Sequence, residues 1–419
     1  MSALRHCFAL IALATIVSTG DVALASAPAS GFIHGTVTTH SGKQYEGFLR
    51  WDAEEAFWDD LFHSARKELP WFEYVDEEVL EKEYELRYNE SRSMIKRIIR
   101  SLGGDSHRYE SSRIFVCRFG DLERLEISHQ NEVLVWTGDG SRHRVSGYSN
   151  DVGGPIVVYS SATKTQKLSW EQIASIDFNQ APTTAVPYAE RLYGTVETSE
   201  GEFAGYIQWD KSECTTTDVL DGTHKGRDME IEMGRIHAII RRNSRSAKVE
   251  LIDGDTFVLE GTNDVNADNR GIMVEKTGVG RVTIPWQRFK RVVFTNGRGS
   301  GPDRASFAHQ RALRGTVVDQ EGQQHYGRLV YDLDEAWSWD IYNGRNDKLE
   351  WDIPFASIAS VKRDGHEHCQ VTLLSGETLR LGGSQDPGPG NDGLLVFADE
   401  HSEPRFVPWR LVSAVRFEH

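Results

Sequence analysis

The stretch Gly315–Asp332, GTVVDQEGQQHYGRLVYD, decides the fold because near-copies of it occur twice more in the chain. The copies are Gly35–Asp52, GTVTTHSGKQYEGFLRWD, and Gly194–Asp210, GTVETSEGEFAGYIQWD. Each copy has a glycine turn within a strand-like pattern and ends on an aromatic residue followed by aspartate. Self-similarity of this kind indicates that the chain is built from repeated structural units.

A shorter skeleton inside this stretch occurs six times, so each repeat has two halves. In every half, a valine that begins a strand is followed five residues later by a glycine, which suits a hairpin turn that needs a positive φ. The six pairs are Val37/Gly42, Val133/Gly138, Val196/Gly201, Val249/Gly254, Val317/Gly322 and Val371/Gly376.

The ends of the six halves match as well. Each half closes with a bulky residue followed by apolar residues three and six positions later, and this spacing predicts one 3₁₀ turn that leads into a short strand. The six sets are Phe119/Leu122/Leu125, Trp170/Ile173/Ile176, Met233/Ile236/Ile239, Trp286/Phe289/Val292, Phe355/Ile358/Val361 and Trp409/Val412/Val415.

Between these ends lie alternating runs of β-branched and aromatic residues, which predict about five short strands in each half. Such strands bury their apolar face best by curling into a small barrel. The predicted fold is therefore all-β, with three tandem repeats at 31–180, 188–296 and 309–419, each made of two small barrels. The barrels resemble SH3-like and Sm-like small barrels. This resemblance concerns architecture alone, so it implies no functional residues and no functional family.

The first half of the first repeat is longer than the others and carries an insertion at about residues 70–105. Its segment 76–104 has an apolar stripe at helical spacing, acidic residues at its start and Lys96, Arg97 and Arg100 near its end, and this pattern predicts a helix. Amphipathic helices usually pack on a core, here the barrel that carries the insertion. A partner-binding or oligomerisation helix is the alternative.

The N-terminus predicts a signal peptide over residues 1–25. Arg5 and His6 precede the apolar run Cys7–Val17, and Ala23-Leu24-Ala25 supplies small residues for cleavage near Ala25. The apolar run is shorter than the roughly 20 residues of a transmembrane helix, and no later segment of the sequence is long enough. The mature chain is expected to be periplasmic or secreted, in a bacterial host.

The composition narrows the range of partners. The sequence has 47 Lys and Arg against 63 Asp and Glu, a formal net charge of −16. Such a surface repels phosphate backbones, so nucleic acid is not an expected partner. After the signal peptide, Cys117, Cys214 and Cys369 remain, and an odd number at unrelated repeat positions favours three buried thiols over a disulfide framework.

An acidic set recurs just beyond each GTV segment and is the predicted ligand-binding site. The set is Trp51, Asp52, Glu55 and Asp60, then Trp209, Asp210, Glu213 and Asp218, then Tyr331, Asp332, Glu335 and Asp340. Three carboxylates on one loop could hold Ca²⁺, or bind a basic ligand beside an aromatic platform. The alternative is structural: the aspartates cap a turn by side-chain hydrogen bonds, and the glutamates are solvated.

A second candidate metal site lies in the loop that begins at Asp264. Asp264, Asn266, Asp268 and Glu275 occupy positions 1, 3, 5 and 12 of an EF-hand-like calcium loop. Asn269 replaces the glycine that position 6 needs, and strands rather than helices should flank the loop. A turn in which Asp and Asn bond the backbone is the alternative. No other cofactor is predicted.

No catalytic motif stands out in the sequence, and no catalytic residue is predicted. The leading hypothesis is an exported, non-catalytic binding or scaffold protein of the bacterial cell envelope, whose partner is an envelope protein or polymer. One alternative is a metal-assisted hydrolase of an envelope polymer that uses the acidic loops, His366 or His368 at a repeat interface. Another is a structural protein that oligomerises through the helical insertion.

Overall fold

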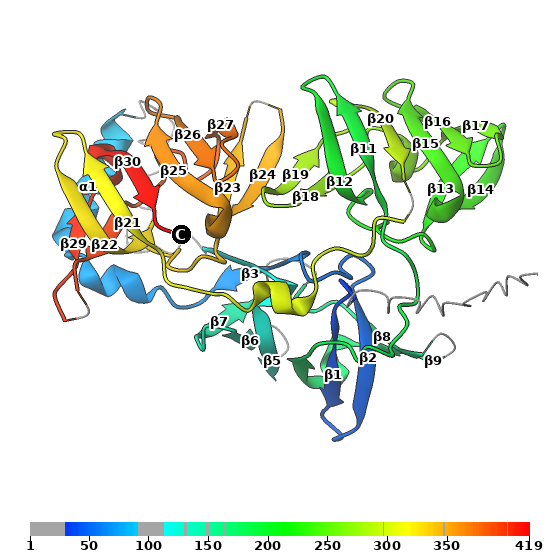
Figure 1. Cartoon of the computed structure of the whole chain (residues 1–419), viewed down its shortest axis with the longest axis horizontal. Helices are drawn as coiled ribbons and strands as arrows, with labels where there is room; N and C mark the ends of the chain where they lie inside the picture. Colours follow the sequence, from blue (N-terminus) through cyan, green and yellow to red (C-terminus); the bar gives the residue numbers. More distant parts are fainter. Residues whose placement is uncertain are drawn as a thin grey trace, which may run out of the picture.

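The structure, a computed structural model, describes residues 30–90, 113–129, 132–147, 151–161, 164–295, 297–346, 348–399 and 401–419. In this part of the chain, thirty β-strands pair antiparallel and one α-helix is present, which confirms the predicted all-β class (Figure 1). The predicted signal peptide lies outside the described residues. So do Lys96, Arg97 and Arg100 of the predicted helix.

The second repeat shows how ten strands form two five-stranded modules. Its outer module has the order β19-β18-β12-β11-β20, and its inner module has the order β14-β13-β17-β16-β15. The outer strands are β11 (Tyr193–Thr198), β12 (Glu202–Gln208), β18 (Ile272–Lys276), β19 (Gly280–Ile284) and β20 (Phe289–Phe294). The inner strands are β13 (Val219–His224), β14 (Arg227–Glu232), β15 (Ile236–Arg241), β16 (Ser246–Leu251) and β17 (Thr256–Glu260).

The first and third repeats have the same arrangement. The first has outer strands β1 (His34–Thr39), β2 (Gln44–Trp51), β8 (Ile156–Ser161), β9 (Lys164–Leu168) and β10 (Ile173–Phe178), and inner strands β3 (Leu61–Arg66), β4 (Ile114–Arg118), β5 (Leu122–His129), β6 (Glu132–Thr137) and β7 (Arg142–Ser146). The third has outer strands β21 (Arg314–Asp319), β22 (Gln324–Tyr331), β28 (Leu394–Phe397), β29 (Arg405–Val407) and β30 (Val412–Phe417), and inner strands β23 (Ile341–Arg345), β24 (Glu350–Pro354), β25 (Ile358–Arg363), β26 (His368–Leu373) and β27 (Thr378–Gly382).

Each half of a repeat contributes strands to both modules. In the second repeat, β11 and β12 pair in the outer module, while β13, β14 and β15 of the same half pair in the inner one. The two halves carry the same hairpin pattern. Strands of one half can therefore replace the equivalent strands of the other half in a module, as in a domain swap. The modules meet where β15 pairs with β20 and Ile239 lies opposite Val292, its equivalent in the other half.

The turns follow the sequence pattern with one exception. Five of the six skeleton glycines have positive φ, but in the turn between β6 and β7 this role falls to Gly140 (φ 85°) rather than Gly138. The predicted 3₁₀ turn is confirmed in five halves, and the sixth half has a turn there. The five are η2 (Phe119–Asp121), η3 (Trp170–Gln172), η4 (Met233–Arg235), η7 (Phe355–Ser357) and η8 (Trp409–Leu411).

The core of each outer module joins aromatic residues from both halves. Trp209 at the end of β12 meets Trp286 edge-on, with ring centroids 6.2 Å apart. The equivalent pairs are Trp51 with Trp170 at 6.0 Å and Tyr331 with Trp409 at 5.7 Å. Edge-to-face pairs of this kind contribute about 0.5–1.5 kcal/mol beyond the burial of their area. The three predicted buried thiols are also confirmed: all are free and buried.

The three repeats contact one another. Figure 1 shows the second repeat (green) beside the third (yellow to red), with the first repeat below both. Strand β19 of the second repeat pairs antiparallel with β24 of the third, which joins their sheets. Among the described residues, no helix is long and apolar enough to cross a membrane.

Helix α1 (Glu77–Glu90) packs on the third repeat rather than on the barrel that carries it (Figure 1). Leu80 belongs to a buried cluster with Leu333 and Leu395 of the third repeat. The carboxylate of Glu83 accepts two hydrogen bonds from Arg410, at 2.7 and 2.9 Å. The expectation of packing on the first barrel is therefore wrong, because an apolar stripe does not specify which module it covers.

Candidate functional site: the acidic crossover loops

The predicted acidic set lies in the connections through which the first half of each repeat passes from the outer to the inner module. Residues 51–60 lead from β2 to β3, residues 209–218 from β12 to β13, and residues 331–340 from β22 to β23. We call these segments the crossover loops. The chain returns from the inner to the outer module through a second connection, which contains Asp264 in the second repeat. The acids therefore lie where the interleaved modules are joined.

The aromatic residues that begin the crossover loops are core residues. Trp51, Trp209 and Tyr331 are each 0% exposed, so their rings do not form an open aromatic platform. Their polar atoms anchor the return connections. The indole N–H of Trp51 donates to the carbonyl of Asp151, that of Trp209 to Asp264, and the hydroxyl of Tyr331 to Asp386, each at 2.9 Å.

Asp151, Asp264 and Asp386, which lie in the return connections, also bind the inner modules through their side chains. In each repeat, one carboxylate oxygen accepts the backbone N–H of a residue in the first inner strand. The pairs are Asp151 with His63 at 2.6 Å, Asp264 with Asp221 at 2.7 Å, and Asp386 with Asn343 at 2.5 Å. Each aspartate thus ties the crossover loop to the return connection.

The last acid of each crossover loop shapes the loop itself. Oδ2 of Asp60 accepts the backbone N–H groups of Ala56 and Phe57, both at 2.8 Å. Asp218 and Asp340 bind the equivalent N–H groups in their loops at 2.8–2.9 Å. The structural alternative, an aspartate that caps a turn, is therefore confirmed for these three residues.

The same aspartates also join the repeats, because each meets an arginine from another repeat. Asp60 pairs with Arg281 at 2.8 Å, Asp218 with Arg50 at 3.3 Å, and Asp340 with Arg66 at 3.1 Å. All three arginine side chains are at most 10% exposed. A buried charge that loses its partner is strongly destabilising. These pairs therefore favour one orientation of the repeats, in which each aspartate meets its arginine.

The first acid of each loop lies in a conformation that is unusual for a residue with a side chain. Asp52, Asp210 and Asp332 have φ of 43°, 50° and 50°, and the residue after each is also left-handed. Aspartate adopts this region more readily than most residues with a side chain, and here contacts from the return connection hold it. Asp210 accepts a hydrogen bond from the side chain of Asn263, and Asp332 accepts one from the backbone N–H of Asp392.

The glutamates of the set keep an unused hydrogen-bonding position. Glu55, Glu213 and Glu335 each leave one buried oxygen, Oε2, without a hydrogen-bond partner. Burial raises the pKa of Glu213 to about 9. Burial also raises the pKa of Glu55 and of Glu335 well above the usual range, and neighbouring carboxylates add to the effect. These glutamates are not the solvated side chains of the structural alternative.

The third repeat concentrates the most acids around its crossover loop. Arg113, which comes from the first repeat, pairs with Asp332 at 2.9 Å, with Asp334 at 3.0 Å and with Asp392. Burial raises the pKa of Asp386 to about 8 and that of Asp340 to about 6. A cavity of about 350 Å³ opens beside this group, and Asp334, Glu335 and Asp386 line it.

The four residues of the EF-hand-like loop do not form one group. Asp264 has ligand atoms within 4.8 Å of those of Asp210 and Glu213 in the crossover loop, and burial raises its pKa to about 6. Asn266 accepts the backbone N–H of Asp268 at 2.6 Å, which is a turn contact. Glu275 lies in β18 and pairs with Arg281 at 3.4 Å.

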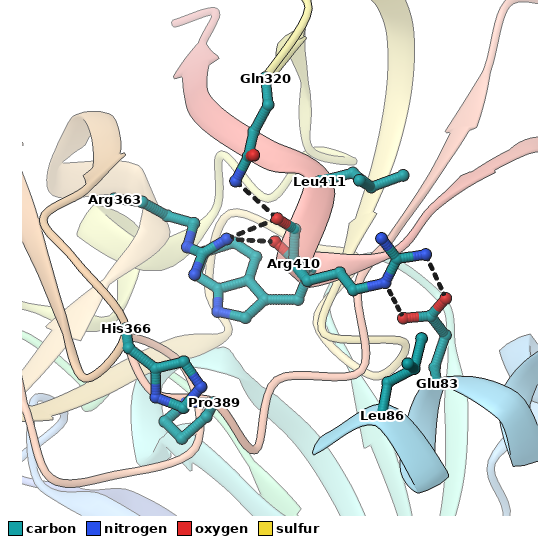
Figure 2. Close-up of a pocket in the computed structure, with 9 residues that line it drawn as sticks. Glu83, Leu86, Gln320, Arg363, His366, Pro389, Arg410 and Leu411 are labelled. Atoms are coloured by element: carbon teal, nitrogen blue, oxygen red, sulfur yellow. Dashed lines mark hydrogen bonds and ion pairs between the residues drawn. The ribbon is translucent and has the colours of Figure 1, made fainter. Parts of the chain in front are cut away.

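A second cavity, of about 320 Å³, lies between α1 and the third repeat (Figure 2). Arg363 donates to the carbonyls of Trp409 and Arg410 at 3.1 and 2.8 Å, and Gln320 donates to Arg410 at 2.7 Å. Trp409 lines this cavity, and its buried indole N–H has no hydrogen-bond partner among the described residues. His366, one of the two predicted histidines, also lines it. No sequence pattern marks this site, since its residues are brought together by the docking of α1.

Comparison of the chain with protein-family models, with curated proteins and with solved structures finds no match.

Proposed function

We propose that the protein is an exported, non-catalytic scaffold of the bacterial cell envelope, built from SH3-like small barrels and able to bind an envelope protein or polymer. The observation that supports this proposal is that the recurring acidic residues have structural contacts. They hold the modules together and pair with buried arginines of neighbouring repeats, such as Asp60 with Arg281 and Asp340 with Arg66. Such contacts suit a rigid body with one fixed arrangement of six modules.

The cavity between α1 and the third repeat is the proposed binding site (Figure 2). It is lined by Trp409, whose buried indole N–H has no hydrogen-bond partner in the described part of the chain, and by Arg363, whose guanidinium carbon lies 5.7 Å from the centre of the Trp409 ring. Donors that converge beside an aromatic ring suit a ligand group that accepts hydrogen bonds, such as a carboxylate or a sugar hydroxyl. Both groups are common in envelope polymers and proteins.

Site-specific photo-crosslinking tests this proposal. With benzoyl-phenylalanine in place of His366, we expect one discrete adduct with a component of the envelope fraction. The control places the same residue at Ile252, which is 60% exposed in the second repeat and does not line the cavity. No adduct at position 366, or equal adducts at both positions, would contradict a binding site in this cavity.

A further inference from the structure

We propose that the acidic group of the third repeat is a divalent-cation site, suited to Ca²⁺, formed by Asp332, Asp334 and Glu335 with Asp386 beside them. The site is independent of the cavity assigned above to partner binding. It lies instead where the crossover loop of the third repeat meets the first repeat, which contributes Arg66 and Arg113 to the same group.

The spacing of the oxygens fits a hard cation. Asp332, Asp334 and Glu335 can each offer one carboxylate oxygen, and these atoms all lie within 4.8 Å of one another. Ca²⁺ binds oxygen ligands at about 2.3–2.6 Å, so two oxygens on opposite sides of the ion are about 5 Å apart. All three residues are buried, which distinguishes them from the scattered acids of an ordinary surface.

Glu335 provides the independent sign of a ligand. The residue is 8% exposed and lines the cavity of about 350 Å³, and its buried Oε2 has no hydrogen-bond partner among the described residues. A buried acceptor that is left unsatisfied costs about 1–3 kcal/mol. Oxygen ligands alone favour Ca²⁺ or Mg²⁺ over softer metals. The adjoining space can hold the water molecules that would complete the coordination of such an ion.

The charge balance of this group also calls for a cation. Two arginines, Arg66 and Arg113, face a larger number of buried carboxylates, which leaves an excess of four negative charges if all are ionised. The six carboxylates are Asp332, Asp334, Glu335, Asp340, Asp386 and Asp392. A divalent ion would offset half of this excess charge.

The second repeat has a less acidic version of the same loop. Ser212 stands at the position of Asp334, and Arg270 at that of Asp392, so a positive charge from the same repeat faces Asp210 at 3.5 Å. Its unpartnered glutamate, Glu213, is also less buried than Glu335. The second repeat therefore supplies a matched position at which the same substitution should not affect cation binding.

Calorimetric titration of the full chain with CaCl₂, after treatment with chelator and dialysis, tests the site. We expect one Ca²⁺ per chain and a higher melting temperature in its presence. Glu335→Gln should weaken Ca²⁺ binding about 10-fold or more and abolish the shift in melting temperature. Glu213→Gln should change the affinity by less than about twofold, because the repeat 2 group has the same oxygen spacing but Ser212 and Arg270 in place of two carboxylates.

Melting without Ca²⁺ distinguishes a lost ligand from a misfolded variant. Glutamine keeps the shape of Glu335 and removes a charge that burial disfavours, so Glu335→Gln should melt without Ca²⁺ no lower than the parent chain. Three results would overturn the proposal: no heat and no melting shift in the parent chain, unchanged affinity in Glu335→Gln, or loss of binding in Glu213→Gln.

Discussion

Replacing Arg113 with methionine should lower the free energy of unfolding by about 3–5 kcal/mol, because it removes one partner of a buried charged group. The guanidinium is 4% exposed and contacts Asp332, Asp334 and Asp392, none of which is more than 4% exposed at its side chain. Without Arg113 these carboxylates lose their shared counter-charge. Urea denaturation measures the loss, provided that the free energy of unfolding falls with urea concentration at the same slope in both proteins.

Arg113→Lys is the matched control for this experiment. Lysine keeps a positive charge but cannot present the planar fork through which Arg113 bonds several carboxylates at once. We therefore expect Arg113→Lys to lower the free energy of unfolding, but by less than Arg113→Met does. A loss below about 1 kcal/mol for Arg113→Met, the range of exposed ion pairs, would show that this contact does not hold the first and third repeats together.

Asp60→Ala should cost a similar amount, about 3–5 kcal/mol, for two separate reasons. The substitution frees the backbone N–H groups of Ala56 and Phe57, and it removes the closest carboxylate from Arg281, whose side chain is 5% exposed. Thermal or urea denaturation of the full chain gives the loss. The effect should extend to the second repeat, because Arg281 belongs to β19.

Asp60→Asn separates the two contributions. The asparagine oxygen can still accept from Ala56 and Phe57, while the charge that faces Arg281 is lost. We expect roughly half of the effect of alanine, since the turn contacts of about 1 kcal/mol each survive. Equal losses in both variants would mean that the ion pair alone matters, and no loss in the asparagine variant would mean that the turn alone matters.

The repeat pattern predicts the strands well because it is local. Val317 and Gly322 lie five residues apart on one hairpin, and the bulky residue that precedes the last strand of each half signals a 3₁₀ turn within the next three residues. Interactions over such short distances depend on neighbouring residues only, so a single sequence contains them. The class of the fold and the positions of the buried cysteines follow from the same information.

The exchange of strands between halves could not be predicted, because the sequence pattern does not determine which strands pair. Strand β12 could pair within its own half or with β18 of the other half, and both halves carry the same alternation of apolar residues. The docking of α1 on the third repeat has the same origin, since Leu80 fits any apolar face. Arg113 carries no local pattern at all, and its role is visible only where it reaches Asp332.

The sequence shows that the acidic residues recur, but it does not show which structural role each of them has. Asp60 and its equivalents form turns, which was one of the two readings of the pattern. The structural alternative expected Glu335 to be solvated, but the residue is 8% exposed, and its burial depends on tertiary contacts that the loop sequence does not contain. The role of Asp386 could not be predicted, because its partner Asn343 lies 43 residues away in the sequence.

The central claim is that strands of the two halves interleave within each repeat, and an engineered disulfide tests it most directly. Thr223 in β13 and Glu260 in β17 come from different halves of the second repeat and are paired across the inner module. Cross-strand partners lie about 4.5–5.5 Å apart at their Cα atoms, within the range of a disulfide. The double variant Thr223→Cys/Glu260→Cys should form this bond within one chain on mild oxidation. Peptide mapping that finds both thiols free, or bonded only between chains, would contradict the interleaved fold.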